Sequence, residues 1–183
     1  MMCMTTPRIA SFLLPLLLVA CASQPHKSLR TASDVDLHRY AGRWYEIARL
    51  PNSFQRDDSR ATADYTIEQD GDLRVLNTEH RPDGRTKEAA GHATAVPQSG
   101  GGRLRVKFTG LAALAPVPRE GNYWIIALAP DYSATLVGTP DRKFLWLLAR
   151  RADFPAAQRN RYLKIARGEG FAVEKVLFAD WPR

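Results

Sequence analysis

The residues that most often carry out chemistry are few in this sequence and are not grouped. Its four histidines, His26, His38, His80 and His92, do not follow a metal-ligand spacing. No Gly-x-Ser-x-Gly motif for an activated serine occurs, and both cysteines lie within the first 21 residues. We therefore expect no enzyme, no bound metal and no cofactor.

The second cysteine, Cys21, has a chemistry of its own. An apolar run from Ile9 to Ala20 follows the positive charge of Arg8, an order typical of an export signal and too short to span a bilayer comfortably. The run ends in Leu-Val-Ala-Cys, which resembles the bacterial lipoprotein box, where the cysteine is acylated and becomes the new amino terminus. An ordinary cleaved secretory signal with a chance cysteine is the alternative.

The lipoprotein resemblance also implies a location. Three acyl chains would hold Cys21 firmly in a membrane, because each buried methylene contributes about 0.8 kcal/mol. Ala22 follows instead of the aspartate that marks inner-membrane retention in many enterobacteria. We expect a signal peptide at 1–20, a lipidated tether at 21–34 and a folded domain at 35–183, anchored to a bacterial outer membrane on its periplasmic leaflet.

The charge of the chain excludes one class of partner. The formal net charge is +7, but the basic residues are scattered singly between acidic and apolar neighbours. A nucleic-acid-binding surface would gather them in a run or along one helix face. We expect a solvated basic surface and no nucleic-acid partner.

Short alternating segments follow one another along the domain and predict strands. Turn residues such as those of Asp70-Gly71-Asp72 separate them, which is typical of an antiparallel meander. We expect strands near 44–49, 61–69, 73–80, 88–96, 103–108, 123–129, 135–138 and 144–150. Eight such strands can close into an up-and-down barrel that leaves no edge exposed and has room for one small ligand.

One helix is expected after the last of these strands. Asp153 can cap its start, Pro155 suits its first turn, and Gly168 can end it. We predict an all-β protein with this α-helix packed outside the barrel, and a final short strand at 176–178 paired with the first.

The sequence resembles the lipocalin family, most closely its bacterial outer-membrane and apolipoprotein D branches. Three blocks carry the resemblance: Gly42-x-Trp44 with Tyr45-Glu46-Ile47-Ala48; Asp131-Tyr132 after Tyr123-Trp124-Ile125-Ile126-Ala127-Leu128; and Pro140-Asp141-Arg142 with Phe144-Leu145-Trp146-Leu147-Leu148-Ala149-Arg150. It extends from about Val35 to Trp181. In the family, residues matching Trp44 and Arg150 close the barrel floor through a cation–π contact, and Gly42 allows the tight turn before the tryptophan.

The resemblance and strand alternation together nominate the residues that line the ligand cup. They are Tyr65, Asn77, Glu79, Phe108, Tyr123 and Trp146. Two alternatives stay open. These aromatic side chains can instead fill a closed core, and Glu79 can be an ordinary exposed residue at a strand end.

The function implied by the resemblance is reversible binding, for storage or transport, of a hydrophobic ligand such as a fatty acid or lysophospholipid. A lipid-acting enzyme of the same fold and a structural envelope module with a filled barrel are the alternatives. A haem-binding relative would need a cup histidine, for which only His80 and His92 are candidates by position. The apolar loop 111–118 can border the open end as a lid or touch a lipid or partner, and a homodimer is left open.

Overall fold

The structure is a computed structural model that describes residues 28–110 and 116–182. Its strands are β1 (Gly42–Arg49), β2 (Arg60–Ile67), β3 (Leu73–His80), β4 (Thr86–Ala95), β5 (Arg103–Phe108), β6 (Tyr123–Leu128), β7 (Ala134–Gly138), β8 (Leu145–Ala149) and β9 (Leu177–Phe178). Its helices are α1 (Leu37–Tyr40), α2 (Ala156–Gly168) and the 3₁₀ turn η2 (Val173–Lys175).

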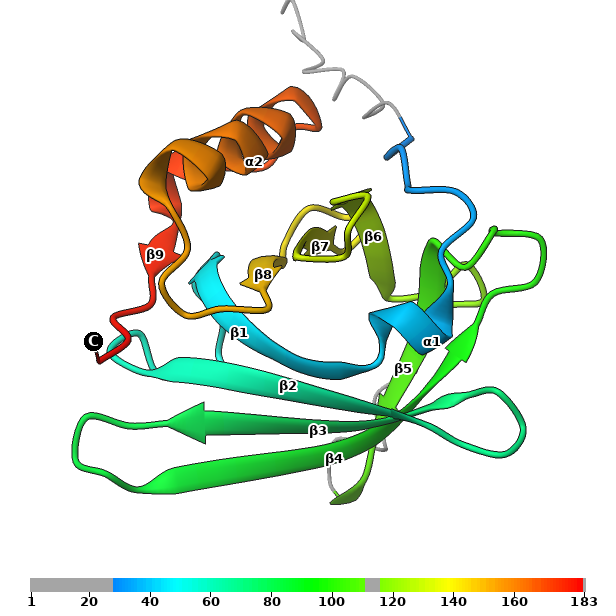
Figure 1. Cartoon of the computed structure of the whole chain (residues 1–183), viewed down its shortest axis with the longest axis horizontal. Helices are drawn as coiled ribbons and strands as arrows, with labels where there is room; N and C mark the ends of the chain where they lie inside the picture. Colours follow the sequence, from blue (N-terminus) through cyan, green and yellow to red (C-terminus); the bar gives the residue numbers. More distant parts are fainter. Residues whose placement is uncertain (1–27, 111–115, 183) are drawn as a thin grey trace, which may run out of the picture.

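Eight antiparallel strands close into a barrel because β1 pairs on both of its edges. Trp44 lies opposite Ala63 of β2, and Tyr45 lies opposite Ala149 of β8. The remaining strands pair in chain order from β2 to β8 (Figure 1). The predicted eight-stranded up-and-down barrel is confirmed, and the closure satisfies strand edges that would otherwise be open.

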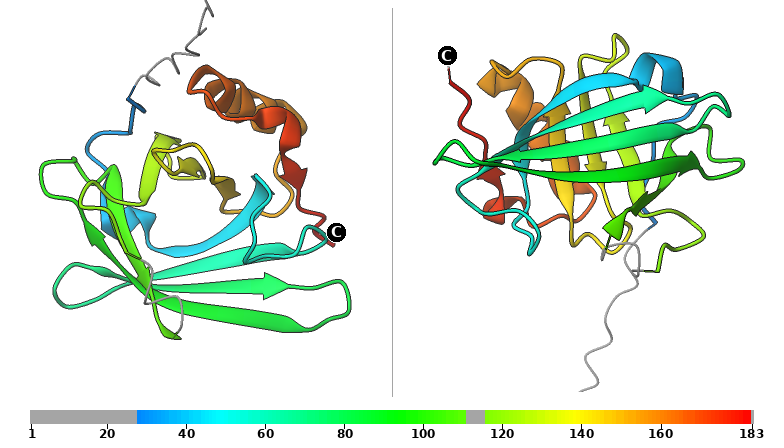
Figure 2. Two further views of the ribbon diagram at one scale, coloured as in Figure 1. Left: turned by 180° about the vertical axis from the view of Figure 1, so that it is seen from behind. Right: turned by 90° about the horizontal axis from the view of Figure 1, so that it is seen from below.

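Alternation along the strands produces two separate apolar cores. Inward positions such as Tyr65, Val75 and Leu104 form one core inside the barrel. Outward positions such as Leu136 and Leu147 form the other, which α2 covers from outside (Figure 1). Figure 2 shows the same helix outside the barrel from two further directions, as the sequence predicted.

The C-terminal elements agree with the sequence in order but not in the helix cap. The last strand, β9, pairs antiparallel with β1 as predicted. The predicted cap by Asp153 is wrong: Pro155 is the N-cap residue and makes no side-chain cap bond. The reason is that Asp153 binds the guanidinium of Arg151, two residues earlier, with an O···N distance of 2.7 Å.

The first described residues, 28–34, contact the barrel. Leu29 is buried in the outer core, and the amide of Ala32 donates to the carbonyl of Ile125 at 2.7 Å. The expected signal peptide and Cys21 lie outside the described residues, as does 111–115 of the apolar loop. Within the described part of the chain, no helix has the length and apolarity needed to cross a membrane.

Candidate ligand-binding cup

The narrow end of the barrel is sealed by Trp44 and Arg150. Trp44 is fully buried, and the guanidinium carbon of Arg150 lies 3.8 Å from the centroid of its indole. Gly42 turns the chain into β1 with a φ of +95°, where a Cβ atom would lie 3.2 Å from Arg150 Nη1. The glycine therefore supplies both the left-handed backbone and the space that the arginine needs.

The hydroxyl groups of three tyrosines meet in hydrogen bonds above the floor. The hydroxyl of Tyr123 lies 2.7 Å from that of Tyr40 and 3.0 Å from that of Tyr65. Burial raises the pKa of Tyr65 to about 12 and also raises the pKa values of Tyr40 and Tyr123. All three hydroxyls stay protonated near neutral pH and form the polar base of the space above, here called the cup.

One wall of the cup is built from small residues. The inward positions of β4 hold Lys87, Ala89, Gly91, Ala93 and Ala95, in alternation with outward neighbours. Ala93 is fully buried near the floor, whereas Ala89 is exposed near the open end. Because the inward side chains from Ala89 to Ala95 are so short, this side of the barrel leaves room in the cup, with Lys87 nearer the mouth.

Three aromatic rings pack together at the open end. Phe144 and Trp146 stack with their ring centroids 6.0 Å apart, and Phe54 lies 5.5 Å from Phe144 and 6.3 Å from Trp146. Phe54 belongs to the loop of residues 50–59 that joins β1 to β2, here called the mouth loop. Its side chain is 53% exposed, so a large apolar surface faces solvent at the mouth.

A buried ion pair lies below the mouth loop. Glu46 and Arg49 of β1 are almost fully buried, with Arg49 Nε 3.5 Å from Glu46 Oε1. Gln55 donates to the same oxygen at 3.1 Å. Burial raises the pKa of Glu46 to about 7, although Arg49 and Gln55 act to lower it.

A second carboxylate, Glu79, holds the mouth loop in place. Its Oε1 accepts the backbone N–H of Arg56 at 3.0 Å, and its Oε2 lies 3.3 Å from Arg81 Nη2. Burial alone would raise the pKa of Glu79, but these donors hold it below its usual value. Arg49 Nη2 donates to the carbonyl of Arg56, so two buried charges bind the backbone of one loop residue, one at its N–H and one at its carbonyl.

A family model described as a lipocalin-like domain matches residues 35–180, which include every strand of the barrel. The chain belongs to the lipocalin family. This agrees with the resemblance recognised in the sequence.

Relatives in bacteria, plants and animals align with most of this lipocalin. It is 34% identical over 178 residues to the outer membrane lipoprotein Blc of Escherichia coli strain K12. That alignment covers 96% of this chain and 97% of the E. coli protein. Temperature-induced lipocalin-1 of Arabidopsis thaliana is 36% identical over 154 residues, covering 82% and 81%. The fold matches insecticyanin of the hornworm Manduca sexta with a TM-score of 0.63 at 17% identity, over 86% of each chain.

The predicted ligand residues of the lipocalin all lie on inward positions but at different depths. Tyr65 and Tyr123 meet in the tyrosine group, and Trp146 lies at the mouth. Phe108 packs against Gly91, where an added Cβ would lie 3.0 Å from its ring. Asn77 and Glu79 share the inward face of β3.

Some members of the cup were not predicted. They are Tyr40, Glu46, Arg49, Phe54 and Phe144. For Glu46 a signal was present, because it stands two residues after Trp44 in the same strand and must share its inward face. Arg49 could not be found in this way, since the register of β1 shifts between Glu46 and Ala48.

The two candidate haem histidines lie on the outer face of the barrel. His80 Nε2 is 3.1 Å from the hydroxyl of Thr62. His92 lies between Glu68 and Asp72, each 3.0 Å from one ring nitrogen. Asp70 lies nearby as a third carboxylate, but both ring nitrogens of His92 already contact the carboxylates of Glu68 and Asp72. Neither histidine can ligate a haem inside the cup.

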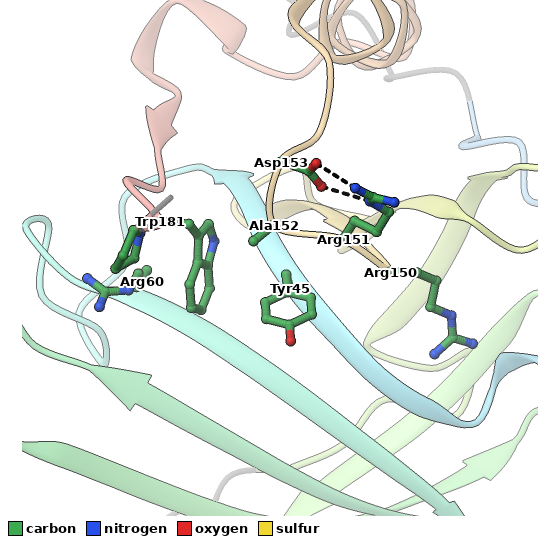
Figure 3. A pocket seen from close by; sticks show the side chains of 8 residues that line it. Tyr45, Arg60, Arg150, Arg151, Ala152, Asp153 and Trp181 are labelled. Atoms are coloured by element: carbon green, nitrogen blue, oxygen red, sulfur yellow. Dashed lines mark hydrogen bonds and ion pairs between the residues drawn. The ribbon is translucent and has the colours of Figure 1, made fainter.

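A separate hollow of about 520 Å³ lies on the outer wall beside the C-terminal segment. Tyr45, Arg60 and Trp181 line it, and Figure 3 shows Arg151 paired with Asp153 at its edge. The guanidinium carbon of Arg60 lies 5.1 Å from the Trp181 ring, and Trp181 Nε1 donates to the carbonyl of Glu46. This hollow contains none of the predicted ligand residues.

Proposed function

We propose that this lipocalin reversibly binds a long-chain hydrophobic ligand, a fatty acid or a lysophospholipid, and stores or transports it in a bacterial cell envelope. The observation that carries the proposal is the contrast between the two ends of the barrel. Trp44 and Arg150 seal one end, while the short inward side chains of Ala89, Gly91 and Ala93 leave room towards an aromatic mouth.

Burial of an acyl chain supplies the driving force. Transfer of apolar surface from water is favourable by about 25 cal/mol per Å². Trp146 and Phe108 offer large apolar contact surfaces along the cup, and the tyrosine hydroxyls give it a polar base. An acyl chain that enters past Phe54 would leave water and contact these side chains, and no covalent bond would form or break.

The proposed location rests on the N-terminus and on the relatives. Residues 1–20 act as a lipoprotein signal, Cys21 carries the acyl chains, and 21–34 form a tether to the lipocalin domain of 35–183. The last part of this tether, 28–34, packs on the barrel. The E. coli relative, an outer membrane lipoprotein by name, aligns over nearly the whole chain. We place this protein on the periplasmic leaflet of the outer membrane. Cys21→Ser should release it from the membrane fraction, and retention there would contradict the anchor.

Binding is tested by titrating delipidated protein with a fluorescent fatty acid. We expect saturable binding of one ligand per barrel, weakened about tenfold by Trp146→Ala. Trp181→Ala, which removes a tryptophan from the outer wall, is the matched control and should keep the affinity. Absence of saturable binding to the wild-type protein would instead support a filled structural barrel. Native mass spectrometry of protein from its own cells would identify the natural ligand.

A further inference from the structure

Helix α2 brings basic side chains together on its solvent face. Its 13 residues include four cations but neither Asp nor Glu. Along the chain these cations are separated by other residues, but a turn of about 100° per residue places Arg161 and Lys164 opposite the buried Ala166. Ile165, 40% exposed, and Arg167 lie on either side of them. We call Arg161, Lys164, Ile165 and Arg167 the α2 patch.

The cations of the α2 patch differ from exposed arginines elsewhere in having no carboxylate partner. Arg56, Arg85 and Arg151 each bind a carboxylate two residues away, at O···N distances of 2.6 to 2.9 Å. In the part of the chain that the structure describes, no carboxylate pairs with a cation of α2. The patch therefore presents three charges to an external anion.

The acidic residues around α2 do not cancel this charge. Glu169, directly after the helix, is buried and pairs with Arg30 at 2.8 Å. Asp153, ahead of the helix, pairs with an arginine, and Asp131 accepts two hydrogen bonds from the serine two residues later. Glu174 of η2 is exposed and is followed by a lysine. A positive potential therefore remains over the patch.

The described chain begins beside the end of this helix. Leu29 belongs to the outer core, which also contains Ala166 of α2, and Arg30 binds Glu169. Seven residues lead from Cys21 to Ser28, and an extended chain spans at most about 3.6 Å per residue, or about 25 Å here. Acyl chains on Cys21 would therefore keep the end of α2 within about 25 Å of the lipid surface.

We propose that the α2 patch docks on anionic phospholipid head groups of the membrane that anchors the chain. Its three cations contact phosphates, and Ile165 lies among the head groups. Each Lys or Arg near an anionic surface strengthens binding about fivefold. The geometry rests on the proposed Cys21 anchor, but the docking does not depend on a ligand in the cup. Nucleic acids also carry phosphates, but a lipid anchor would hold the patch next to lipids.

The test uses the chain from residue 21 onward with Cys21→Ser, so that no acyl chain contributes. It is sedimented with vesicles of phosphatidylcholine, with or without phosphatidylglycerol. We expect binding only to the anionic vesicles, weakened on the order of tenfold when the salt concentration rises from about 0.05 to about 0.5 M. Combining Arg161→Gln, Lys164→Gln and Arg167→Gln should weaken it about a hundredfold. Glutamine is a good helix former, so α2 should stay folded.

A matched control removes three exposed cations from other surfaces, by combining Arg74→Gln, Lys107→Gln and Arg119→Gln. Arg74 lies on β3, on the side of the barrel away from α2 (Figure 1). The control should change the affinity less than about threefold, because the charge near the lipid is kept.

Three results would overturn the docking: equal binding to neutral and anionic vesicles, equal losses in the two triple variants, or tighter binding to duplex DNA than to anionic vesicles at equal phosphate concentration. Absence of vesicle binding would also overturn it. If the wild type still stays in the membrane fraction, the Cys21 anchor stands and only the docking fails. Ligand binding in the cup is measured separately with the fluorescent fatty acid.

Discussion

Arg150, the residue directly after β8, lies across Trp44 of β1 and links this strand to helix α1. Its guanidinium carbon is 3.8 Å from the indole centroid, and its Nη2 donates to the carbonyls of Arg39, Tyr40 and Ala41. A cation is favourable at the C-terminal end of a helix, where carbonyls lack partners. One side chain therefore seals the barrel floor and caps the helix that covers it.

Arg150→Lys should destabilise the protein by about 1 to 3 kcal/mol, because an ammonium keeps the charge but cannot stack and reach several carbonyls at once. Urea denaturation measures the change. Arg151→Lys is the matched control, since Arg151 is exposed and pairs only with Asp153 among the described residues; its cost should stay within about 0.5 kcal/mol. Equal costs at the two positions would contradict the role of Arg150.

Tyr123→Phe should cost more stability than Tyr65→Phe. The Tyr123 hydroxyl contacts those of both Tyr40 and Tyr65, so its removal leaves two buried hydroxyls short of a partner. We expect a loss of about 1 to 3 kcal/mol for Tyr123→Phe and roughly half of that for Tyr65→Phe. Chemical denaturation of the two variants checks the order, and a reversed order would show that Tyr123 is not the centre of the group.

The Glu46 carboxyl should make the folded protein less stable as the pH rises from 5 to 8. Its folded pKa is about 7 against 4.5 when exposed, so between these values the folded state keeps a proton that the unfolded state has released. The free energy of unfolding should fall by about 2 to 3 kcal/mol from this group over that range. Urea denaturation of the wild type and Glu46→Gln at several pH values isolates the effect, because only the wild type has this slope.

Glu79→Gln is the control for that pH series. The pKa of Glu79 is lowered in the folded state, so its stabilising contribution is complete above pH 5 and lost only in more acidic solution. The difference between wild type and Glu79→Gln should therefore change little from pH 5 to 8, because burial and not Glu79 is the main cause of the raised pKa of Glu46. Parallel curves for the wild type and Glu46→Gln would contradict the assignment of the slope to Glu46.

Phe54 and Phe178 offer a matched pair for testing the mouth. Both side chains are 53% exposed, but Phe54 packs with Phe144 at the mouth, whereas Phe178 lies under Arg159 on the outer wall. Phe54→Ala should weaken binding of a fluorescent fatty acid about three- to tenfold through lost apolar contact, and Phe178→Ala less than twofold. Similar affinities for the two variants would mean that ligands do not pass or touch Phe54.

The sequence by itself determined the barrel and its floor. Alternation and turn residues predicted the strands, because a half-buried strand needs apolar side chains at every second position. The separate blocks around Trp44, Asp131 and Phe144 identified the family and, through it, the pairing of Trp44 with Arg150. Inward positions such as Tyr65 and Trp146 followed from the same period of two.

Only the tertiary structure decided how the polar side chains of the cup are used. The burial of Glu79 and its hold on Arg56 depend on the mouth loop folding over the barrel, which no local pattern encodes. The inward charge of Arg49 depends on a shift of register within β1. The raised pKa of Glu46 depends on burial that only the closed barrel supplies. Such contacts join residues far apart in the chain, so they are fixed by closure of the barrel and not by propensity.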